Sequence, residues 1–280
     1  MQQAERQILI QNTEIDLLFE SVFRIYGYDF RNYNKAHIRR RILHRITNLK
    51  LESVSQFQHF VLHSEGYFDQ LLRDLSINVT EMFRDPGFYR SMRNEVLPIL
   101  KTYPYLKIWH AGCSTGEEVY SLAILLQEEG LYDRTQIYAT DFNPDVLETA
   151  KKAIYPLSRI KEYTLNYQAS GGTHSFSDYY IANYDSAIFN PSLKKNVVFA
   201  EHNLVTDSVF AEVNLIICRN VLIYFNKDLQ NKVVNLFTDS LVKGGFLGLG
   251  SKENLMFTDV YDLFQVIDHK EKIYKKKMIK

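Results

Sequence analysis

The 280-residue sequence has only two cysteines, Cys113 and Cys218, and they lie far apart. So few cysteines exclude a disulfide framework and are typical of a reducing compartment. No stretch reaches the roughly 18 uninterrupted apolar residues that a membrane helix needs. The first residues lack a basic start followed by an apolar run, so we expect no signal peptide. A soluble cytoplasmic protein without membrane insertion is therefore predicted.

The sequence also lacks net charge, because 33 basic residues balance 33 acidic ones. The molecule as a whole therefore has no general attraction to nucleic acid or to an anionic membrane. Hydrophobic residues make up 46% of the chain, which is enough for a sizeable core. The length is comfortable for two domains.

The first 75 residues show helical periodicity without strand-like alternation. Apolar side chains at helical spacing predict four helices, over 13–23, 34–49, 54–63 and 67–75. We therefore expect an all-helical N-terminal domain over residues 1–75. A linker with a connecting helix is expected over residues 76–103.

From residue 104 the pattern changes to short apolar runs separated by helical periods. The runs lie at 106–111, 136–140, 196–200, 213–218 and 245–249. Helical patterns lie between most of them, at 117–128, 144–153 and 227–241. This alternation predicts an α/β, Rossmann-like domain with a parallel, doubly wound sheet over 104–280. A closing hairpin is compatible with 264–267 and 272–274. Residues 157–195 are rich in Ser, Asn, Tyr and Gly and are too long for a bare loop, so we interpret them as an inserted β-subdomain of short antiparallel strands.

A glycine turn follows the first predicted strand. Gly112 and Gly116 are spaced Gly-x-x-x-Gly, which is neither the dinucleotide fingerprint nor a P-loop. Glu117 and Glu118 then open a helix where a dinucleotide site would seat its pyrophosphate. Carboxylates at that place repel phosphate and favour a cation. The turn therefore indicates a cationic ligand such as S-adenosylmethionine, although simple acidic capping of the helix would give the same pattern.

Polar residues end two further predicted strands. Asp141 lies where the acidic residue that holds a ribose is found, about 20 or more positions after the glycine turn. It could instead cap the next helix, but Asn143, directly before Pro144, is available for that purpose. The fourth strand runs into Cys-Arg-Asn at 218–220, and polar groups there face the ligand crevice of such sheets.

Several motifs occur in one order along the chain. Asn-Val-Thr-Glu-Met-Phe-Arg at 78–84 is similar to an Asn-x-Thr-x-Phe-Phe-Arg motif, with Met82 replacing the first Phe. It is followed by the glycine turn, Asp141, His-Asn-Leu at 202–204, Cys-Arg-Asn-Val-Leu-Ile-Tyr-Phe at 218–225 and Gly-Ser-Lys-Glu-Asn at 250–254. In this combination the sequence resembles the CheR-type chemotaxis receptor glutamate methyltransferases over nearly the whole chain.

The resemblance implies a class I methyltransferase fold and a role for each matched residue. The implied cofactor-binding residues are Asn78, Thr80, Arg84, Gly112, Glu118, Asp141, Asn203, Leu204, Arg219 and Asn220. Glu118 would hold the methionine ammonium and Asp141 the ribose, while Asn203 and Leu204 would flank the adenine. Arg84 and Tyr224 would be catalytic, and either would position the acceptor carboxylate. No metal is expected.

The predicted second helix is strongly basic, and residues 31–50 contain no acid. We interpret Arg39, Arg40, Arg41 and Arg45 as a docking surface for the acidic helices of a chemotaxis receptor cytoplasmic domain or a similar protein. A merely solvated helix face would look the same. RNA binding is a third interpretation, but zero net charge and the lack of an aromatic platform in this helix count against it.

The predicted reaction is methyl-ester formation on glutamate side chains, with S-adenosylmethionine as donor and S-adenosylhomocysteine as product. A glutamate with an ordinary pKa of about 4.3 is already ionised at neutral pH, so the reaction needs no general base. Two alternatives stay open: a non-catalytic signalling module that binds S-adenosylmethionine, and an RNA methyltransferase.

Overall fold

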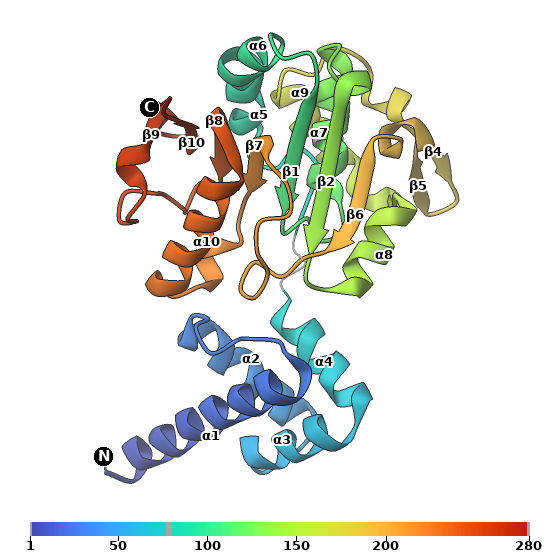
Figure 1. Cartoon of the computed structure of the whole chain (residues 1–280). Coiled ribbons are helices and arrows are strands. Elements are labelled where there is room, and N and C mark those ends of the chain that lie inside the picture. The colour runs from blue at the N-terminus through green and yellow to red at the C-terminus, as the bar shows by residue number, and fades with distance from the viewer. Residues whose placement is uncertain (1, 77–79, 279–280) are drawn as a thin grey trace. The chain divides into compact units, whose positions relative to one another are not determined.

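The computed structural model describes residues 2–76 and 80–278 (Figure 1). By its internal contacts the chain forms two units. The helical unit contains the described part of residues 1–77 together with residues 223–230. The larger unit contains the described part of 78–222 together with 231–280, and it carries all the strands. Each unit has its own hydrophobic core.

The helical unit consists of α1 (Gln2–Tyr26), α2 (Lys35–Asn48), α3 (Val54–His63) and α4 (Glu65–Leu75). Fully buried Leu18, Ile42 and Phe57 come from three of these helices and form the core. The four predicted helices are confirmed, but α1 begins eleven residues earlier than residue 13, at Gln2. Its early residues are mostly exposed, so they lack the apolar periodicity from which the helix was predicted.

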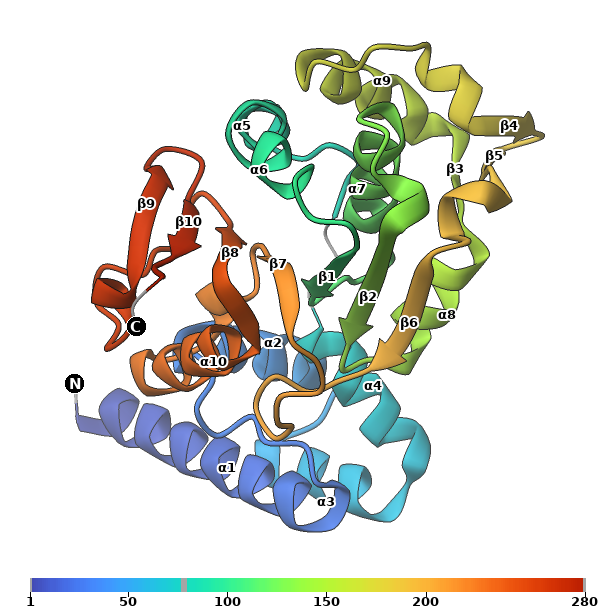
Figure 2. The same cartoon turned by 45° about the horizontal axis from the view of Figure 1, so that its top comes forward.

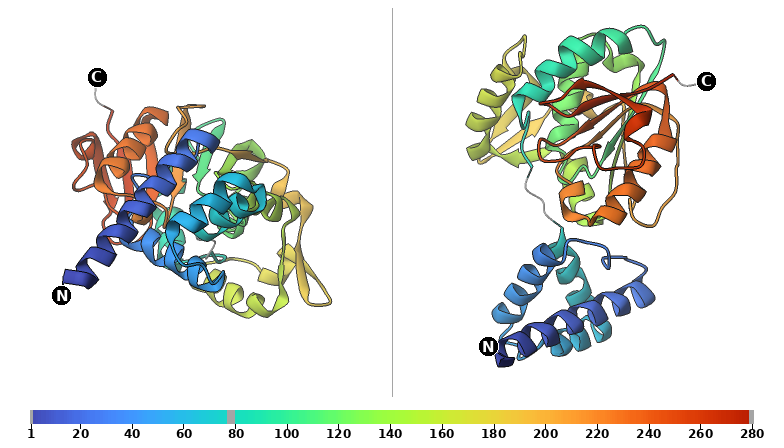
Figure 3. Two further views of the ribbon diagram at one scale, coloured as in Figure 1. Left: turned by 90° about the horizontal axis from the view of Figure 1, so that it is seen from below. Right: turned by 90° about the vertical axis from the view of Figure 1, so that its left-hand side faces the viewer.

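The larger unit is built on a seven-stranded sheet with the order β6-β2-β1-β7-β8-β10-β9 (Figures 1 and 2). The strands are β1 (Leu106–Ala111), β2 (Thr135–Asp141), β6 (Val197–Glu201), β7 (Val213–Cys218), β8 (Leu241–Leu249), β9 (Phe264–Asp268) and β10 (Ile273–Lys276). The first five lie parallel, and β10 pairs antiparallel with both β8 and β9. The doubly wound sheet and the C-terminal hairpin are thus confirmed, and β9 and β10 face the viewer in the right-hand view of Figure 3.

Neighbouring residues of a strand point to opposite faces of the sheet, and helices cover both of these faces. Ile108 of β1 lies in the core shared with α7 (Glu117–Glu128). Trp109 turns the other way and meets Phe237 of α10 (Lys227–Ser240), with the ring centroids 5.4 Å apart. Helix α8 (Pro144–Lys152) joins β2 to the insert. Because the five strands are parallel, their carboxyl ends lie at one edge of the sheet, where a doubly wound sheet binds its ligand.

A helix with one irregular turn precedes β1. It consists of α5 (Pro86–Ser91), a π-helical turn (Met92–Val96) and α6 (Leu97–Leu100). Pro98 has no N–H to donate to the preceding turn, which accounts for the widened hydrogen-bonding pattern before it. None of the helices that the structure describes is both long and apolar enough to cross a membrane.

The insert contains a three-stranded antiparallel sheet, as expected, with the order β3-β5-β4. Its strands are β3 (Ile154–Pro156), β4 (Tyr180–Asn183) and β5 (Ser186–Phe189). Two expectations were wrong, because β3 begins before residue 157 and a ten-residue helix, α9 (Ile160–Ala169), lies within the insert. Ile160, Tyr163 and Tyr167 are its buried residues. The helix was not predicted because two of its three buried residues are tyrosines, which contributed to the polar composition that is typical of a loop.

Candidate active site

The turn between β1 and α7 requires its two glycines. Gly112 has φ 72°, and a Cβ added there would lie 2.5 Å from a methyl carbon of Val221. Gly116 has φ 92°, and an added Cβ would lie 2.8 Å from the Cβ of Ala150. The turn therefore packs closely against the β7 loop and α8, and only glycine combines this conformation with this packing. Such a turn lets backbone approach a ligand closely.

Asp141, at the end of β2, connects the two neighbouring turns. Its Oδ2 accepts from the N–H of Ser114 at 2.9 Å, and its Oδ1 accepts from the N–H of Asn143 at 3.1 Å. Burial raises the pKa of Asp141, and these N–H groups oppose that rise. Asn143 accepts from the N–H of Asp145 and so caps α8, as expected. The N–H of Phe142 also bonds this carboxylate, which has about four acceptor positions, so Asp141 can still accept a ligand hydroxyl.

Glu118, Arg219 and Asp85 form a charge cluster beside the same turn, and the side chain of Asp85 is 39% exposed. One guanidinium nitrogen of Arg219 bonds Glu118 Oε1, and the other lies 2.6 Å from Asp85 Oδ2. The guanidinium also lies 4.4 Å from the ring centroid of Phe88. The side chains of Arg219 and Glu118 are only 1% and 8% exposed. Two carboxylates around one guanidinium leave one negative charge in excess, which favours an organic cation at this place.

Five polar side chains around the carboxyl edge have buried atoms without a hydrogen-bond partner among the described residues. These atoms are both ring nitrogens of His110, Ser114 Oγ, Asn220 Oδ1, His202 Nδ1 and Arg219 Nε. Burial lowers the pKa of His110 to about 4, and the nearby Arg219 adds to this shift, while Glu118 opposes it. Buried polar groups of folded proteins nearly always have partners, so these atoms fit a site that takes a polar ligand. Sequence analysis missed His110, although a histidine in an otherwise apolar strand beside the glycine turn was a usable signal.

A second carboxylate fixes the loop after β7. Glu253 Oε2 accepts from the N–H of Asn220 at 3.0 Å and from the N–H of Gly250 at 2.6 Å. Glu253 is only 4% exposed, and Asn220 has φ 61°, the left-handed region. A non-glycine residue in this conformation is uncommon and costs about 1 kcal/mol or more, so it persists where its surroundings hold it. The motif containing Glu253 was recognised in the sequence, but this role was not.

The remaining residues of the larger unit that were predicted to bind the cofactor lie in two places. The carbonyl of Arg84 accepts from Arg219 at 3.1 Å, which places the 80–85 segment beside the charge cluster, and Thr80 is buried. Asn203 and Leu204 follow β6, where the N–H of His202 donates to the Asp141 carbonyl at 3.1 Å. The side chain of Asn203 accepts from the Val205 N–H and shapes this turn. Asn78 lies outside the described residues.

Tyr224 and the docking arginines belong to the helical unit. The Tyr224 carbonyl accepts from the N–H of Asn34 at 2.7 Å. Arg45 makes two hydrogen bonds of 2.5 Å to the carboxylate of Asp74, and Arg41 bonds the Asp74 carbonyl. Arg39 donates to Gln11 at 2.7 Å, whereas Arg40 is exposed. Three of the four arginines therefore have partners within the unit, and the catalytic and docking roles stay predictions.

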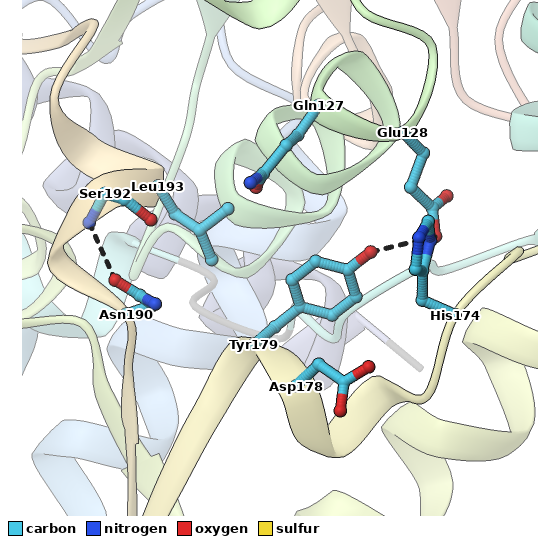
Figure 4. Close-up of a pocket in the computed structure, with 8 residues that line it drawn as sticks. All are labelled: Gln127, Glu128, His174, Asp178, Tyr179, Asn190, Ser192 and Leu193. Carbon is cyan, nitrogen blue, oxygen red and sulfur yellow. Dashed lines mark hydrogen bonds and ion pairs between the residues drawn. The ribbon is translucent and has the colours of Figure 1, made fainter.

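A pocket of about 370 Å³ lies elsewhere, between the end of α7 and the insert (Figure 4). It is lined by Gln127, Glu128, His174, Asp178, Tyr179, Asn190, Ser192 and Leu193. Glu128 accepts from the Tyr179 hydroxyl at 2.9 Å and also bonds Tyr167 and Arg93. These bonds attach the insert to α7, so we interpret them as structural. Across residues 2–76 and 80–278, no group of three or more His, Cys, Asp or Glu residues is arranged to hold a metal ion.

A doubly wound sheet whose ligand edge combines a glycine turn with an excess negative charge suits a domain of the class that binds S-adenosylmethionine. The comparisons with known proteins agree. The family model described as the CheR methyltransferase SAM-binding domain matches residues 78–273, and the CheR methyltransferase all-alpha domain matches residues 13–76. The chain belongs to the CheR methyltransferase family, and its cofactor is S-adenosylmethionine.

Named relatives extend along nearly the whole chain. Cher3 of Pseudomonas putida, named as a methyltransferase, is 53% identical over 268 residues, which are 95% of this chain and 98% of the relative. The chemotaxis protein methyltransferase of Listeria innocua is 31% identical over 259 residues, covering 91% and 96%. Among solved structures, the N-methyltransferase NodS from Bradyrhizobium japonicum, in complex with S-adenosylhomocysteine, matches with a TM-score of 0.35 and 14% identity, covering 65% and 71%. This last match is too distant to bear on function.

Proposed function

We propose that this protein transfers the methyl group of S-adenosylmethionine to glutamate side chains of chemotaxis receptors and forms methyl esters. The family membership and the chemotaxis methyltransferase names of relatives support this reaction. The observation that carries it is the charge cluster in which the buried Arg219 lies between Glu118 and Asp85. Its excess negative charge suits a ligand that carries an ammonium and a sulfonium. The receptor's cytoplasmic domain would be the partner, so the protein would act in the cytoplasm.

The chain's residues would bind the cofactor as follows. Glu118 bonds Arg219 through Oε1, and its carboxylate would hold the methionine ammonium. Asp141, already fixed by the N–H groups of Ser114 and Asn143, would hold the ribose. The close approach that Gly112 allows would let the turn contact the cofactor, with Asn203 and Leu204 beside the adenine. These roles agree with the chemistry of each group.

Bound S-adenosylmethionine supplies a methyl group activated by a positively charged sulfur, which the acceptor carboxylate attacks in line. That carboxylate is ionised at neutral pH, so the chain has no proton to remove. The groups near the charge cluster are poor general bases, as expected for a reaction that needs none. His110, with a pKa of about 4, is a weak base, and burial raises the pKa of the Tyr89 hydroxyl, which therefore stays protonated. The work of the site is therefore to orient the carboxylate and to exclude water.

Arg84 or Tyr224 is proposed to position the acceptor carboxylate. Replacing Arg84 with Ala should lower kcat by about 100-fold or more, because the loss of a charge-assisted contact and of orientation act together. The affinity for S-adenosylhomocysteine should fall much less. Equal losses in transfer and in affinity would instead make Arg84 a plain cofactor residue.

The activity is tested by incubating the full chain with methyl-labelled S-adenosylmethionine and a receptor cytoplasmic domain, followed by mild alkali. Release of labelled methanol from the protein fraction is the expected result, because carboxyl methyl esters are base-labile. Label that enters added RNA and resists alkali would support the RNA methyltransferase instead. Binding of the cofactor without transfer to any acceptor would support the non-catalytic module.

A further inference from the structure

Two exposed apolar residues lie on the loop that follows Glu253. Met256 is 50% exposed and Phe257 is 79% exposed, while their neighbour Leu255 is fully buried. A single exposed apolar residue is ordinary, but two adjacent large ones on one loop form a patch that is costly to leave in water.

The loop displays these side chains in a fixed conformation. Leu255 is inserted into the core, and its carbonyl accepts from both the N–H and the hydroxyl of Thr258, at 2.9 and 2.7 Å. The side chain of Asn254 accepts from the N–H of Met256 at 3.0 Å. The local backbone is therefore hydrogen-bonded on both sides of the pair. Because the loop is ordered in this way, a partner would meet a preformed apolar surface and little conformational entropy would be lost on binding.

The same loop is attached to the candidate site. Glu253, three residues before Met256, accepts from the N–H groups of Asn220 and Gly250. Asn220 follows the central strand β7, at the edge where the methyl transfer is proposed to occur. A macromolecule that brings a carboxylate to this edge would approach the loop that continues from Glu253. The acceptor protein is the partner that the proposed reaction itself requires.

We propose that Met256 and Phe257 form an apolar contact for the acceptor protein, against apolar side chains that flank its target glutamate. This inference rests on the proposed function and adds a determinant of substrate recognition to it. The charge cluster selects the cofactor, and the arginines of α2 would attract an acidic partner from a distance. The apolar pair would favour glutamates that lie in an apolar surrounding on the partner over equally acidic ones that do not.

The test compares Phe257→Ser and Met256→Ser with wild type, using the full chain and a receptor cytoplasmic domain. Burial of a large apolar side chain is worth about a tenfold change in binding or more, so KM for the receptor should rise at least about tenfold in Phe257→Ser. The affinity for S-adenosylhomocysteine and the thermal midpoint should not change. The ratio of KM values should persist at high salt, because apolar contacts are not screened.

Leu165→Ser is the matched control, because Leu165 is 58% exposed on α9 and lies outside the site. It should leave KM unchanged. A Phe257→Ser variant with wild-type KM, or an equal rise in Leu165→Ser, would overturn the proposed contact while leaving the proposed function in place. If wild type itself fails to methylate the receptor domain, the proposed function fails first, and this contact fails with it.

Discussion

Replacing Glu118 with Gln tests the charge argument with little change of shape. The side chain is 8% exposed and bonds Arg219, which is itself buried. The glutamine amide oxygen can still accept from Arg219, so the hydrogen bond is kept. What is lost is one negative charge, and the cluster of Arg219 with Glu118 and Asp85 changes from an excess negative charge to neutral.

The size of the effect follows from the interaction that is removed. A hydrogen bond to a charged group contributes about 1.5–3 kcal/mol, so the affinity for the ammonium of the cofactor should fall about 10- to 150-fold. Stability should fall by less than the roughly 3–5 kcal/mol expected when one partner of a buried ion pair is removed outright. Asp85 still pairs with Arg219 in the variant, and this limits the loss.

Isothermal calorimetry with S-adenosylhomocysteine, which retains the ammonium, measures the effect directly. Glu117→Gln is the matched control, because Glu117 is the neighbouring buried carboxylate and bonds Thr115 rather than Arg219. It should bind within about threefold of wild type, since no charge near Arg219 is removed. Wild-type affinity in Glu118→Gln, with the protein folded, would refute the assignment of Glu118 to the ammonium.

Three further predictions concern the groups around the site and the insert. Gly112→Ala should destabilise the fold by about 2–4 kcal/mol in denaturant unfolding, from its positive φ and from overpacking against Val221, and adding Val221→Ala should recover the steric part only. His110 has a folded pKa of about 4, below its unfolded value of about 6.5, so the unfolded state binds more protons between these two values. The free energy of unfolding should therefore fall by about 3 kcal/mol as pH drops from about 6.5 to about 4. His110→Asn should abolish this fall. Burial would raise the pKa of Glu128, but hydrogen bonds from Tyr167 and Arg93 hold this pKa below its usual value. The contribution of Glu128 to stability is therefore present at neutral pH and lost as pH falls through the folded pKa. Glu128→Gln should make the decrease of stability toward acid pH less steep. A wild-type acid limb in that variant, or unchanged pH dependence in His110→Asn, would contradict the stated environments.

Buried elements with clear boundaries were predicted to the residue. The strand Val213–Cys218 and the helix Glu117–Glu128 have observed bounds identical to those expected. Both combine an apolar pattern with a turn signal at one end, so local information was sufficient. Helix Ile160–Ala169 was missed because its buried face is partly tyrosine. The early part of α1 was missed because it has few buried residues.

The site was predictable as a set of residues but not as a set of contacts. The sequence indicated Glu118 and Arg219 separately, yet they lie 101 positions apart and meet only because β7 lies beside β1. Arg45 was interpreted as a docking residue, and its partner Asp74 is 29 positions away on another helix. The bonds from Glu253 to the Asn220 loop depend in the same way on the order of the strands. Long-range pairing of this kind has no signature in local pattern or propensity.

The most direct test of the account is to locate the transferred methyl group. A receptor cytoplasmic domain is incubated with wild-type protein and S-adenosylmethionine, digested at low pH to preserve esters, and mapped by tandem mass spectrometry. The account predicts a mass increase of one methyl group on glutamate side chains, which is lost after mild alkali and absent when those glutamates are replaced by alanine. Methyl groups found only on lysine, arginine or amide nitrogen would contradict it.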